Sequence, residues 1–422
     1  MNSGQRTLRR RLGTADAVVI GLGAMLGTGV FTVMAPAAAA AGRWLLAGLL
    51  LAAAVAACNA VSSADLAAAH PQSGGTYHYG RERLGQEWGF LAGSSFLVGK
   101  SASCAAAALV FATYLAPGAL RPAALAAVAA VTVLNMAGIR WSARGTWVLV
   151  GLVLGVLVVL AGTVLARSHG VGRLTGPTRL DPATTPARVL RSAGLLFFAF
   201  AGYARIATLG EEVRDPARTI RRAIPLALAM TVVVYTVVAL ACLVALGPAA
   251  LGRSEAPLAD AVRAVGTPGL VPLAVGGAAL ATLSVLLSVQ IGVSRTLFAM
   301  ARQHDLPAIL ASVGSRGTPW RADLLIAGVV AGLVLVLDPA SAVGVSAYCV
   351  LLYYAIANTA ALRLGGDERH WPRWTAWCGL AGCLVLAGTL PVAAIGTGSA
   401  LVAVLVTGRW AARRRPRRRS PR

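Results

Sequence analysis

Long runs of apolar residues separated by short polar stretches fill the chain from residue 15 to residue 410. A membrane-spanning helix needs about 20 predominantly apolar residues to cross the hydrocarbon core of a bilayer. Measured against that length, the pattern predicts an all-α membrane protein with about twelve spans. The expected spans are 15–41, 43–66, 88–116, 122–139, 145–166, 190–213, 223–247, 269–298, 322–338, 340–362, 374–390 and 392–410.

The first apolar run, from Asp16 to Pro36, is interrupted at its centre by Gly27, Thr28 and Gly29. Hydrocarbon offers backbone groups no hydrogen-bond partner, so irregular backbone at this depth is tolerated only where it is buried in protein or lines a cavity. Transporters hold their cargo at such breaks near the midplane. The pattern therefore predicts a binding cavity halfway along the first span.

The sixth apolar run is interrupted in a similar way, because Gly202 lies between aromatic residues in the middle of the span. A lone glycine in a membrane helix commonly serves close helix packing, and that alternative stays open. Two breaks five spans apart favour an inverted repeat of five plus five helices, with a binding site between the breaks. This repeat is inferred from topology alone, because the two halves share no visible residue identity.

The two breaks would expose complementary backbone groups. The turn at 27–29 presents N–H groups at the positive end of a half-helix, which suits a carboxylate. The turn at 198–201 presents carbonyls, which suit an ammonium group. Together they would form a receptor for the zwitterionic head of an amino acid. Phe198 or Phe200 is then a candidate aromatic lid over the substrate, with a role in packing as the alternative.

Composition and charge agree with a membrane protein. The chain is 57% hydrophobic and only 13% charged, and it carries a net charge of +23. Most of its basic residues lie in the two tails and in the loops after even-numbered spans, so the positive-inside rule predicts cytoplasmic termini in the cell membrane. We expect the basic C-tail to contact lipid headgroups and not nucleic acid, which would require a basic patch on a folded domain.

Other functional classes have little support in the sequence. The six cysteines lie within or beside apolar runs, where we expect them to act as small hydrophobic residues. The five histidines lie in loops, without a nucleophile, metal-ligand or phosphate-loop pattern nearby. We therefore expect no covalent catalysis, no bound metal, no cofactor and no ATP-driven pumping by this chain.

Four motifs resemble the amino acid-polyamine-organocation superfamily, and its cationic amino acid transporter branch most closely. They are GLGAMLGTGVF, the P-x-x-G-G-x-Y-x-Y run from Pro71 to Tyr79, FFAFAGYARIATLGEEVRDPARTI, and SRTLFAMARQHDLP followed by Thr318-Pro319. The resemblance implies a LeuT-type fold, alternating access, and recognition of an amino acid by backbone groups at the two breaks. It assigns carboxylate binding to Leu26, Gly27, Thr28 and Gly29, and ammonium binding to the carbonyls of Phe198, Ala199 and Ala201.

Two positions depart from the resembled pattern. The branch commonly carries G-F-D after the sixth-span break, whereas this chain has Gly202-Tyr203-Ala204 and so lacks an acidic partner for a cationic substrate side chain. Proton-coupled relatives carry a lysine in span five, where this chain has Val153. Transport of an amino acid in general is therefore better supported than transport of arginine or lysine.

Lys100 is the only lysine in the chain. It lies 12 residues after Trp88, or about 18 Å into the third span. A buried lysine, unlike an arginine, can lose its proton near physiological pH. Lys100 is therefore a candidate carrier of a coupling proton. The alternative is a structural hydrogen bond to a neighbouring carbonyl or to a hydroxyl such as that of Ser94, Ser101 or Ser103.

Glu211 and Glu212 follow the sixth-span break at the predicted cytoplasmic end of the span. Their carboxylates could meet basic groups there and close an inner gate. A solvated helix end at the headgroup level is the alternative.

These observations together predict a secondary amino acid transporter coupled to protons, with sodium as the other coupling ion to consider. A polyamine or organic-amine transporter, an amino-acid exchanger and a non-transporting sensor are the competing hypotheses. The expected organisation is a basic cytoplasmic N-tail (1–14), a first repeat (15–166), an external loop (167–189), a second repeat (190–362), two further spans (363–410) and a basic cytoplasmic C-tail (411–422).

Overall fold

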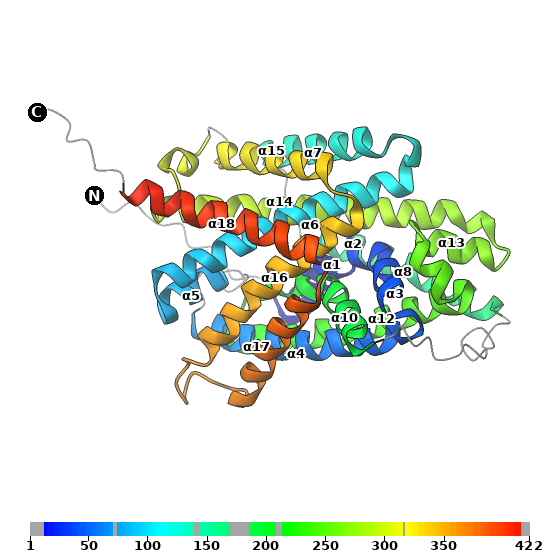
Figure 1. Cartoon of the computed structure of the whole chain (residues 1–422), viewed down its shortest axis with the longest axis horizontal. Helices are drawn as coiled ribbons and strands as arrows, with labels where there is room; N and C mark the ends of the chain where they lie inside the picture. Colours follow the sequence, from blue (N-terminus) through cyan, green and yellow to red (C-terminus); the bar gives the residue numbers. More distant parts are fainter. Residues whose placement is uncertain are drawn as a thin grey trace, which may run out of the picture.

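The computed structural model describes residues 12–70, 74–138, 143–168, 185–207, 213–314 and 317–414 (Figure 1). Regular structure in these ranges is helical, apart from one isolated bridge between Leu12 and Val213. The α-helices are α1 (Thr14–Met25), α2 (Thr28–Thr32), α3 (Met34–Ala41), α4 (Leu45–Ala69), α5 (Thr76–Leu84), α6 (Gln86–Leu115), α7 (Leu120–Met136), α8 (Ala143–Arg167), α10 (Pro186–Phe200), α11 (Ala204–Ala207), α12 (Pro216–Arg253), α13 (Pro257–Ala264), α14 (Val271–Arg302), α15 (Trp320–Val336), α16 (Pro339–Ala361), α17 (Arg373–Thr389) and α18 (Val392–Arg414). The 3₁₀ helices are η1 (Gly42–Trp44), η2 (Pro117–Ala119), η3 (Ala201–Tyr203), η4 (Pro268–Leu270) and η5 (Ala308–Ala311).

Ten helical segments of the described chain are long and apolar enough to cross a membrane. Helices α15 and α17 contain 17 residues each. At 1.5 Å per residue, such a helix covers about 26 Å, slightly less than the hydrocarbon core of about 30 Å. The structure thus describes a multi-pass membrane protein with ten clear candidate spans, and the total of twelve stays a prediction.

The helix is interrupted at both places where the sequence predicted a break. Helix α1 ends at Met25 and α2 begins at Thr28, with Gly27 in a non-helical conformation (φ −100°, ψ −124°). Helix α10 ends at Phe200 and passes through η3 before α11 begins. Each interruption leaves backbone groups without partners in their own helix, because the ends of a helix cannot complete its hydrogen-bonding pattern.

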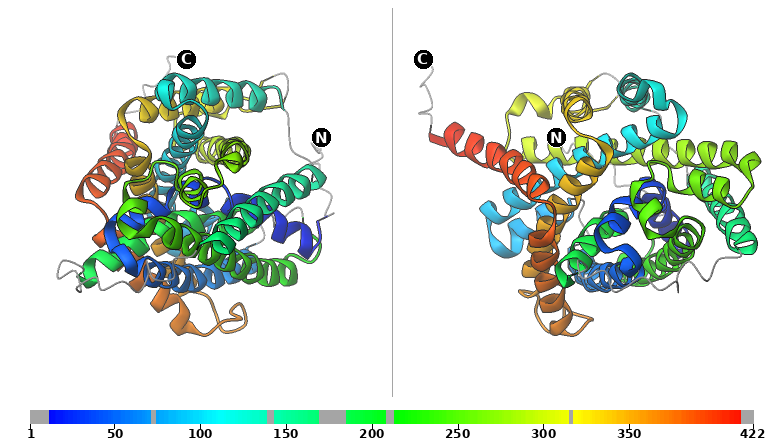
Figure 2. Two further views of the ribbon diagram at one scale, coloured as in Figure 1. Left: turned by 90° about the vertical axis from the view of Figure 1, so that its right-hand side faces the viewer. Right: turned by 45° about the vertical axis from the view of Figure 1, so that its right-hand side comes forward.

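The helices pack around a central group that includes α6, α14 and α16. Helix α6 contacts both α14 and α16, while α1 packs against α12 and α8. Helices α7 and α15 lie side by side along one edge (Figure 1). Helices α17 and α18 lie at the periphery (Figure 2).

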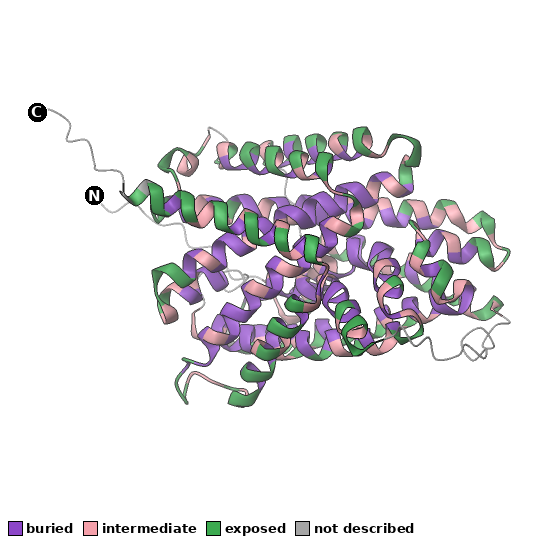
Figure 3. Cartoon of the chain, viewed as in Figure 1, coloured by how far each residue is buried: buried purple, intermediate pink, exposed green. Residues whose placement is uncertain are grey.

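Buried residues concentrate in the middle of the bundle, and the outward helix faces are exposed (Figure 3). Several of the exposed side chains are large and apolar, such as Val158 on α8, Val336 on α15 and Val392 on α18, which are 69%, 78% and 82% exposed. Soluble monomers rarely expose large apolar patches. A lipid environment explains this surface.

Several expected connectors fall partly outside the described residues. These are the N-tail up to residue 11, residues 71–73, and residues 169–184 of the expected external loop. Glu211 and Glu212, the candidate gate residues, also lie outside the described residues. Helix α18 continues to Arg414, past the expected start of the C-tail at 411, and residues 415–422 lie outside the description.

Candidate functional site at the two helix breaks

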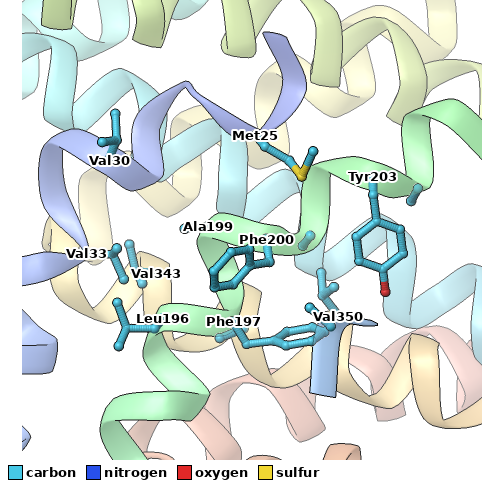
Figure 4. Packing of buried hydrophobic residues seen from close by; sticks show 14 of the residues in the cluster. Met25, Val30, Val33, Leu196, Phe197, Ala199, Phe200, Tyr203, Val343 and Val350 are labelled. Carbon is cyan, nitrogen blue, oxygen red and sulfur yellow. The ribbon is translucent and has the colours of Figure 1, made fainter. Parts of the chain in front are cut away.

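The breaks in the first and sixth apolar runs lie directly against each other. A Cβ atom added at Gly29 would lie 2.5 Å from the Cβ of Ala199, and one added at Gly202 would lie 2.5 Å from the carbonyl carbon of Ala24. Side-chain atoms do not approach this closely, so only glycine allows the two backbones to meet. Residues of both runs belong to one buried cluster, part of which is shown in Figure 4.

Tyr235 on α12 links the two breaks. Its hydroxyl lies within hydrogen-bond distance of the Met25 carbonyl at the end of α1 and 3.1 Å from the Ala199 carbonyl on α10. Its ring packs against Phe200, with 5.2 Å between the ring centroids. Sequence analysis did not single out Tyr235, although a tyrosine in the middle of an apolar run was a usable signal.

The Ala201 carbonyl, in the sixth-span break, accepts two hydrogen bonds from other helices. The Lys100 ammonium on α6 donates at 3.3 Å, and the Tyr354 hydroxyl on α16 donates at 3.2 Å. Tyr354 also stacks on Tyr203 of η3, with a centroid distance of 5.0 Å. The structure therefore directs Lys100 to the sixth-span break. Ser103, one of its expected partners, instead pairs with Ser346 at 2.7 Å.

The turn predicted to bind a carboxylate contains one unsatisfied hydroxyl. Thr28 is 2% exposed, and its Oγ1 has no hydrogen-bond partner in the structure. A buried hydroxyl without a partner has lost its hydrogen bonds to water without replacement, which costs free energy. The Leu26 amide donates to the Leu22 carbonyl and so continues α1. Gly27 lies against Val285 of α14, whose Cγ2 would be 1.9 Å from an added Cβ.

Each carbonyl predicted to bind an ammonium group lies within hydrogen-bond distance of a protein donor, although the single Tyr235 proton is shared between the Ala199 and Met25 carbonyls. The Phe198 carbonyl accepts from the Ala201 amide at the end of α10. The Ala199 carbonyl faces Tyr235, and the Ala201 carbonyl faces Lys100 and Tyr354. An arriving ammonium group would have to share or displace these donors.

The two candidate lid residues differ in their surroundings. Phe200 is fully buried against Tyr235, whereas Phe198 is only partly buried.

At the positions that depart from the resembled pattern, Val153 is buried in α8 and Ala204 is buried in α11. Among the described residues, no group of three or more His, Cys, Asp or Glu side chains could hold a metal ion.

A second polar centre lies where α5 and the end of α18 meet the connector after α14. We call it the Asp305 cluster, and it consists of Tyr77, Arg81, Glu87, Asp305, Arg409 and Arg413. The Asp305 side chain is fully buried and accepts from Tyr77 at 2.8 Å, while its oxygens lie 3.0 Å from Arg81 and 2.9 Å from Arg409. Burial and the adjacent Asp305 carboxylate raise the pKa of Tyr77 well above its usual value.

A neighbouring group of charges joins the end of α4 to the connector between α16 and α17. Arg83 donates to Nε2 of His70 at 2.8 Å and pairs with Glu368. Burial, followed by the positive charge of Arg83, lowers the pKa of His70. Asp65 accepts from the backbone amides of His370 and Trp371, each at 3.1 Å. Sequence analysis missed both groups of charges because their members lie far apart in the chain.

Comparisons with known proteins identify the family. The model of a family described as amino acid permease matches residues 12–409. An uncharacterized transporter of Mycobacterium tuberculosis is 54% identical over 400 residues, which cover 94% of this chain and 90% of that protein. The branched-chain amino acid permease BcaP of Bacillus subtilis is 26% identical over 337 residues, covering 74% of this chain and 71% of that permease.

A plant relative matches more of this chain than BcaP does, but the match covers a smaller share of the plant protein. The vacuolar cationic amino acid transporter 2 of Arabidopsis thaliana is 28% identical over 382 residues, which cover 85% of this chain and 60% of that transporter. These relatives confirm the resemblance to the amino acid-polyamine-organocation superfamily. The chain therefore belongs to the amino acid permease family, whose members are transporters and not enzymes.

Proposed function

We propose that this protein is a secondary transporter that moves an amino acid across the cell membrane by alternating access. The proposed architecture is a LeuT-type repeat of five plus five helices followed by two extra spans, with both termini in the cytoplasm. The observation that carries the proposal is the contact between the two helix breaks, with an unsatisfied Thr28 hydroxyl on one side and a set of carbonyls on the other.

The substrate carboxylate binds at the first-span break. Helix geometry leaves the N–H groups of the first turn of α2 without acceptors in their own helix. The Thr28 hydroxyl adds a donor beside them. In this proposal Gly27 and Gly29 let Val285 and Ala199 pack against the turn, and Leu26 contributes at its edge.

The substrate ammonium binds at the sixth-span break, on the carbonyls of Phe198, Ala199 and Ala201. These carbonyls now lie within hydrogen-bond distance of protein donors, so binding exchanges those contacts for hydrogen bonds to the substrate. Phe198, which is only partly buried, and Phe200 act as the aromatic lid. The exchange links the arrival of substrate to movement of α10 against α6, α12 and α16.

Lys100 carries the coupling proton in this proposal. Its ammonium donates a hydrogen bond to the Ala201 carbonyl at the predicted site. A change in the protonation of Lys100 would therefore alter the same hydrogen bonds that substrate binding alters. Glu211 and Glu212 are proposed to close the inner gate.

Uptake of labelled amino acids into proteoliposomes that contain only this protein tests the function. An inward proton gradient at fixed sodium should stimulate uptake, and Lys100→Met should abolish that stimulation. Flux that requires preloaded unlabelled amino acid would identify an exchanger. Uptake that follows a sodium gradient and ignores pH would contradict proton coupling, and failure to bind any amino acid would contradict the transporter assignment.

A further inference from the structure

The ammonium of Lys100 lacks a carboxylate partner among the described residues. Its hydrogen bond to the Ala201 carbonyl, at 3.3 Å, joins it to an uncharged group. No ion pair of the described chain includes Lys100. A positive charge deep in a membrane protein is costly unless a negative charge or a strong set of hydrogen bonds compensates it.

The described acidic residues lie away from the middle of the membrane spans. The chain has 15 acidic residues, of which Asp181, Glu211 and Glu212 lie outside the described ranges. The others lie in connectors, in the short helices α5 and α13, or within the outer turns of a span. None of these described carboxylates lies in the middle of a spanning helix, where the breaks meet.

The position of Lys100 overlaps that of the proposed substrate. Its Nζ donates a hydrogen bond to the Ala201 carbonyl, and this carbonyl is proposed to bind the substrate ammonium. Lys100 and Gly202 are both partly buried. A lysine side chain is long and flexible, so its ammonium can leave the carbonyl and follow a nearby anion.

We infer that Lys100 selects amino acids whose side chain carries a carboxylate and disfavours those whose side chain is cationic. This inference rests on the proposed function, because it requires the amino-acid head to bind at the two breaks. The head group contributes one positive and one negative charge, which the backbone groups satisfy. A side-chain carboxylate then supplies the negative charge that the described residues do not provide to Lys100, whereas a cationic side chain would place a second positive charge in the same site.

Substrates that differ only in charge give the direct test. Glutamate and aspartate are compared with glutamine and asparagine, which have nearly the same shape, and with arginine. In the wild-type protein we expect the acidic substrates to half-saturate binding and uptake at concentrations lower by at least about tenfold, as expected for a desolvated charge pair. Equal affinity for glutamate and glutamine, or tighter binding of arginine, would overturn the inference and leave amino-acid transport intact.

Two variants separate charge from size. Lys100→Gln should lose the preference for glutamate over glutamine, while Lys100→Arg, which keeps the positive charge, should retain most of it. An unchanged preference in Lys100→Gln would overturn the inference. If the protein binds no amino acid at all, the inference fails together with the proposed function, and this outcome is distinct from loss of selectivity alone.

The wild-type chain allows a test without mutation, because Lys100 is its only lysine. Acetic anhydride modifies lysine amines, and mass spectrometry of the peptide that contains Lys100 reports the extent of modification. Glutamate should slow this modification several-fold more than glutamine at equal concentration. Equal protection by the two would overturn the inference, even if the Lys100 variants fail to fold.

Discussion

The guanidinium of Arg409, near the end of α18, lies 2.9 Å from the carboxylate of Asp305 in the connector after α14. Both side chains are buried, and Arg409 also stacks 4.3 Å above the ring of Phe90 on α6. Through these contacts α18 packs against α6, which carries Lys100 of the candidate site. Helix α18 itself lies outside the proposed repeats.

Removing either partner of this pair should destabilise the protein. Arg409→Ala leaves a buried carboxylate with fewer cationic partners and is expected to cost about 3 kcal/mol, typical for a broken buried ion pair. The apparent melting temperature in detergent would fall by several degrees. Arg413→Ala is the matched control, because Arg413 is 42% exposed and such pairs contribute about 0–1 kcal/mol. Equal effects of the two substitutions would contradict this account.

Thr28 allows a test that separates stability from binding. Its hydroxyl has no protein partner, so Thr28→Val, which keeps the shape, should leave the melting temperature unchanged or slightly raised. The same substitution should weaken amino-acid binding about tenfold, the effect of one lost hydrogen bond to a charged group. Thr28→Ser keeps the hydroxyl and should bind nearly as the wild type does. Wild-type affinity in Thr28→Val would remove this residue from the site.

Glycines at the breaks should tolerate no side chain. Gly29→Ala and Gly202→Ala would each place a methyl group 2.5 Å from atoms of the facing segment, so the two breaks would have to separate. We expect loss of uptake in both variants. Gly151→Ala on α8 is the control, because an added Cβ meets nothing there within 4 Å, and it should transport normally. Normal uptake by Gly202→Ala would show that close approach of the breaks is dispensable.

Tyr235→Phe removes one hydroxyl from the contact between the breaks and keeps the ring against Phe200. Because that hydroxyl joins the end of α1 to Ala199, its loss should change the rate of substrate uptake more than the stability of the fold. A reduction of uptake of about tenfold is expected from one buried hydrogen bond. The control is Tyr348→Phe, whose hydroxyl pairs with Ser399 at an exposed position and should have little effect on uptake.

Stability should fall in mild acid because of His70. Its pKa is lowered by burial and by the charges of Arg83 and His78, while Glu368 and Glu82 act in the opposite direction. The unfolded chain therefore binds a proton at His70 more readily than the folded chain does, and stability rises with pH in that range.

The contribution of neutral His70 to stability is complete above the unfolded-state pKa of about 6.5. It is lost as the pH falls through the lower pKa of His70 in the folded state. The measurement is the apparent melting temperature between pH 7.5 and pH 5.5. Over this interval the melting temperature of the wild type should fall by more than that of His70→Gln. Parallel plots of melting temperature against pH would exclude His70 as the cause.

The sequence by itself determined the membrane character of the chain, the approximate position of most spans and the two breaks. These features follow from properties that are local along the chain. Apolar length predicts a span, and a glycine-rich interruption within it predicts irregular backbone. The family was also visible in motifs around Gly27 and Gly202, and the depth of Lys100 could be counted from Trp88.

Only the tertiary structure decided which side chains meet at those breaks. The contacts of Tyr235 with Ala199, and of Lys100 and Tyr354 with Ala201, depend on the rotation and crossing of separate helices, which hydrophobic patterning does not specify. The same reason explains why the buried pair of Arg409 and Asp305 could not be anticipated. The interaction energy of this pair depends on two charges from distant segments meeting in a buried position, and no local sequence pattern predicts that they meet.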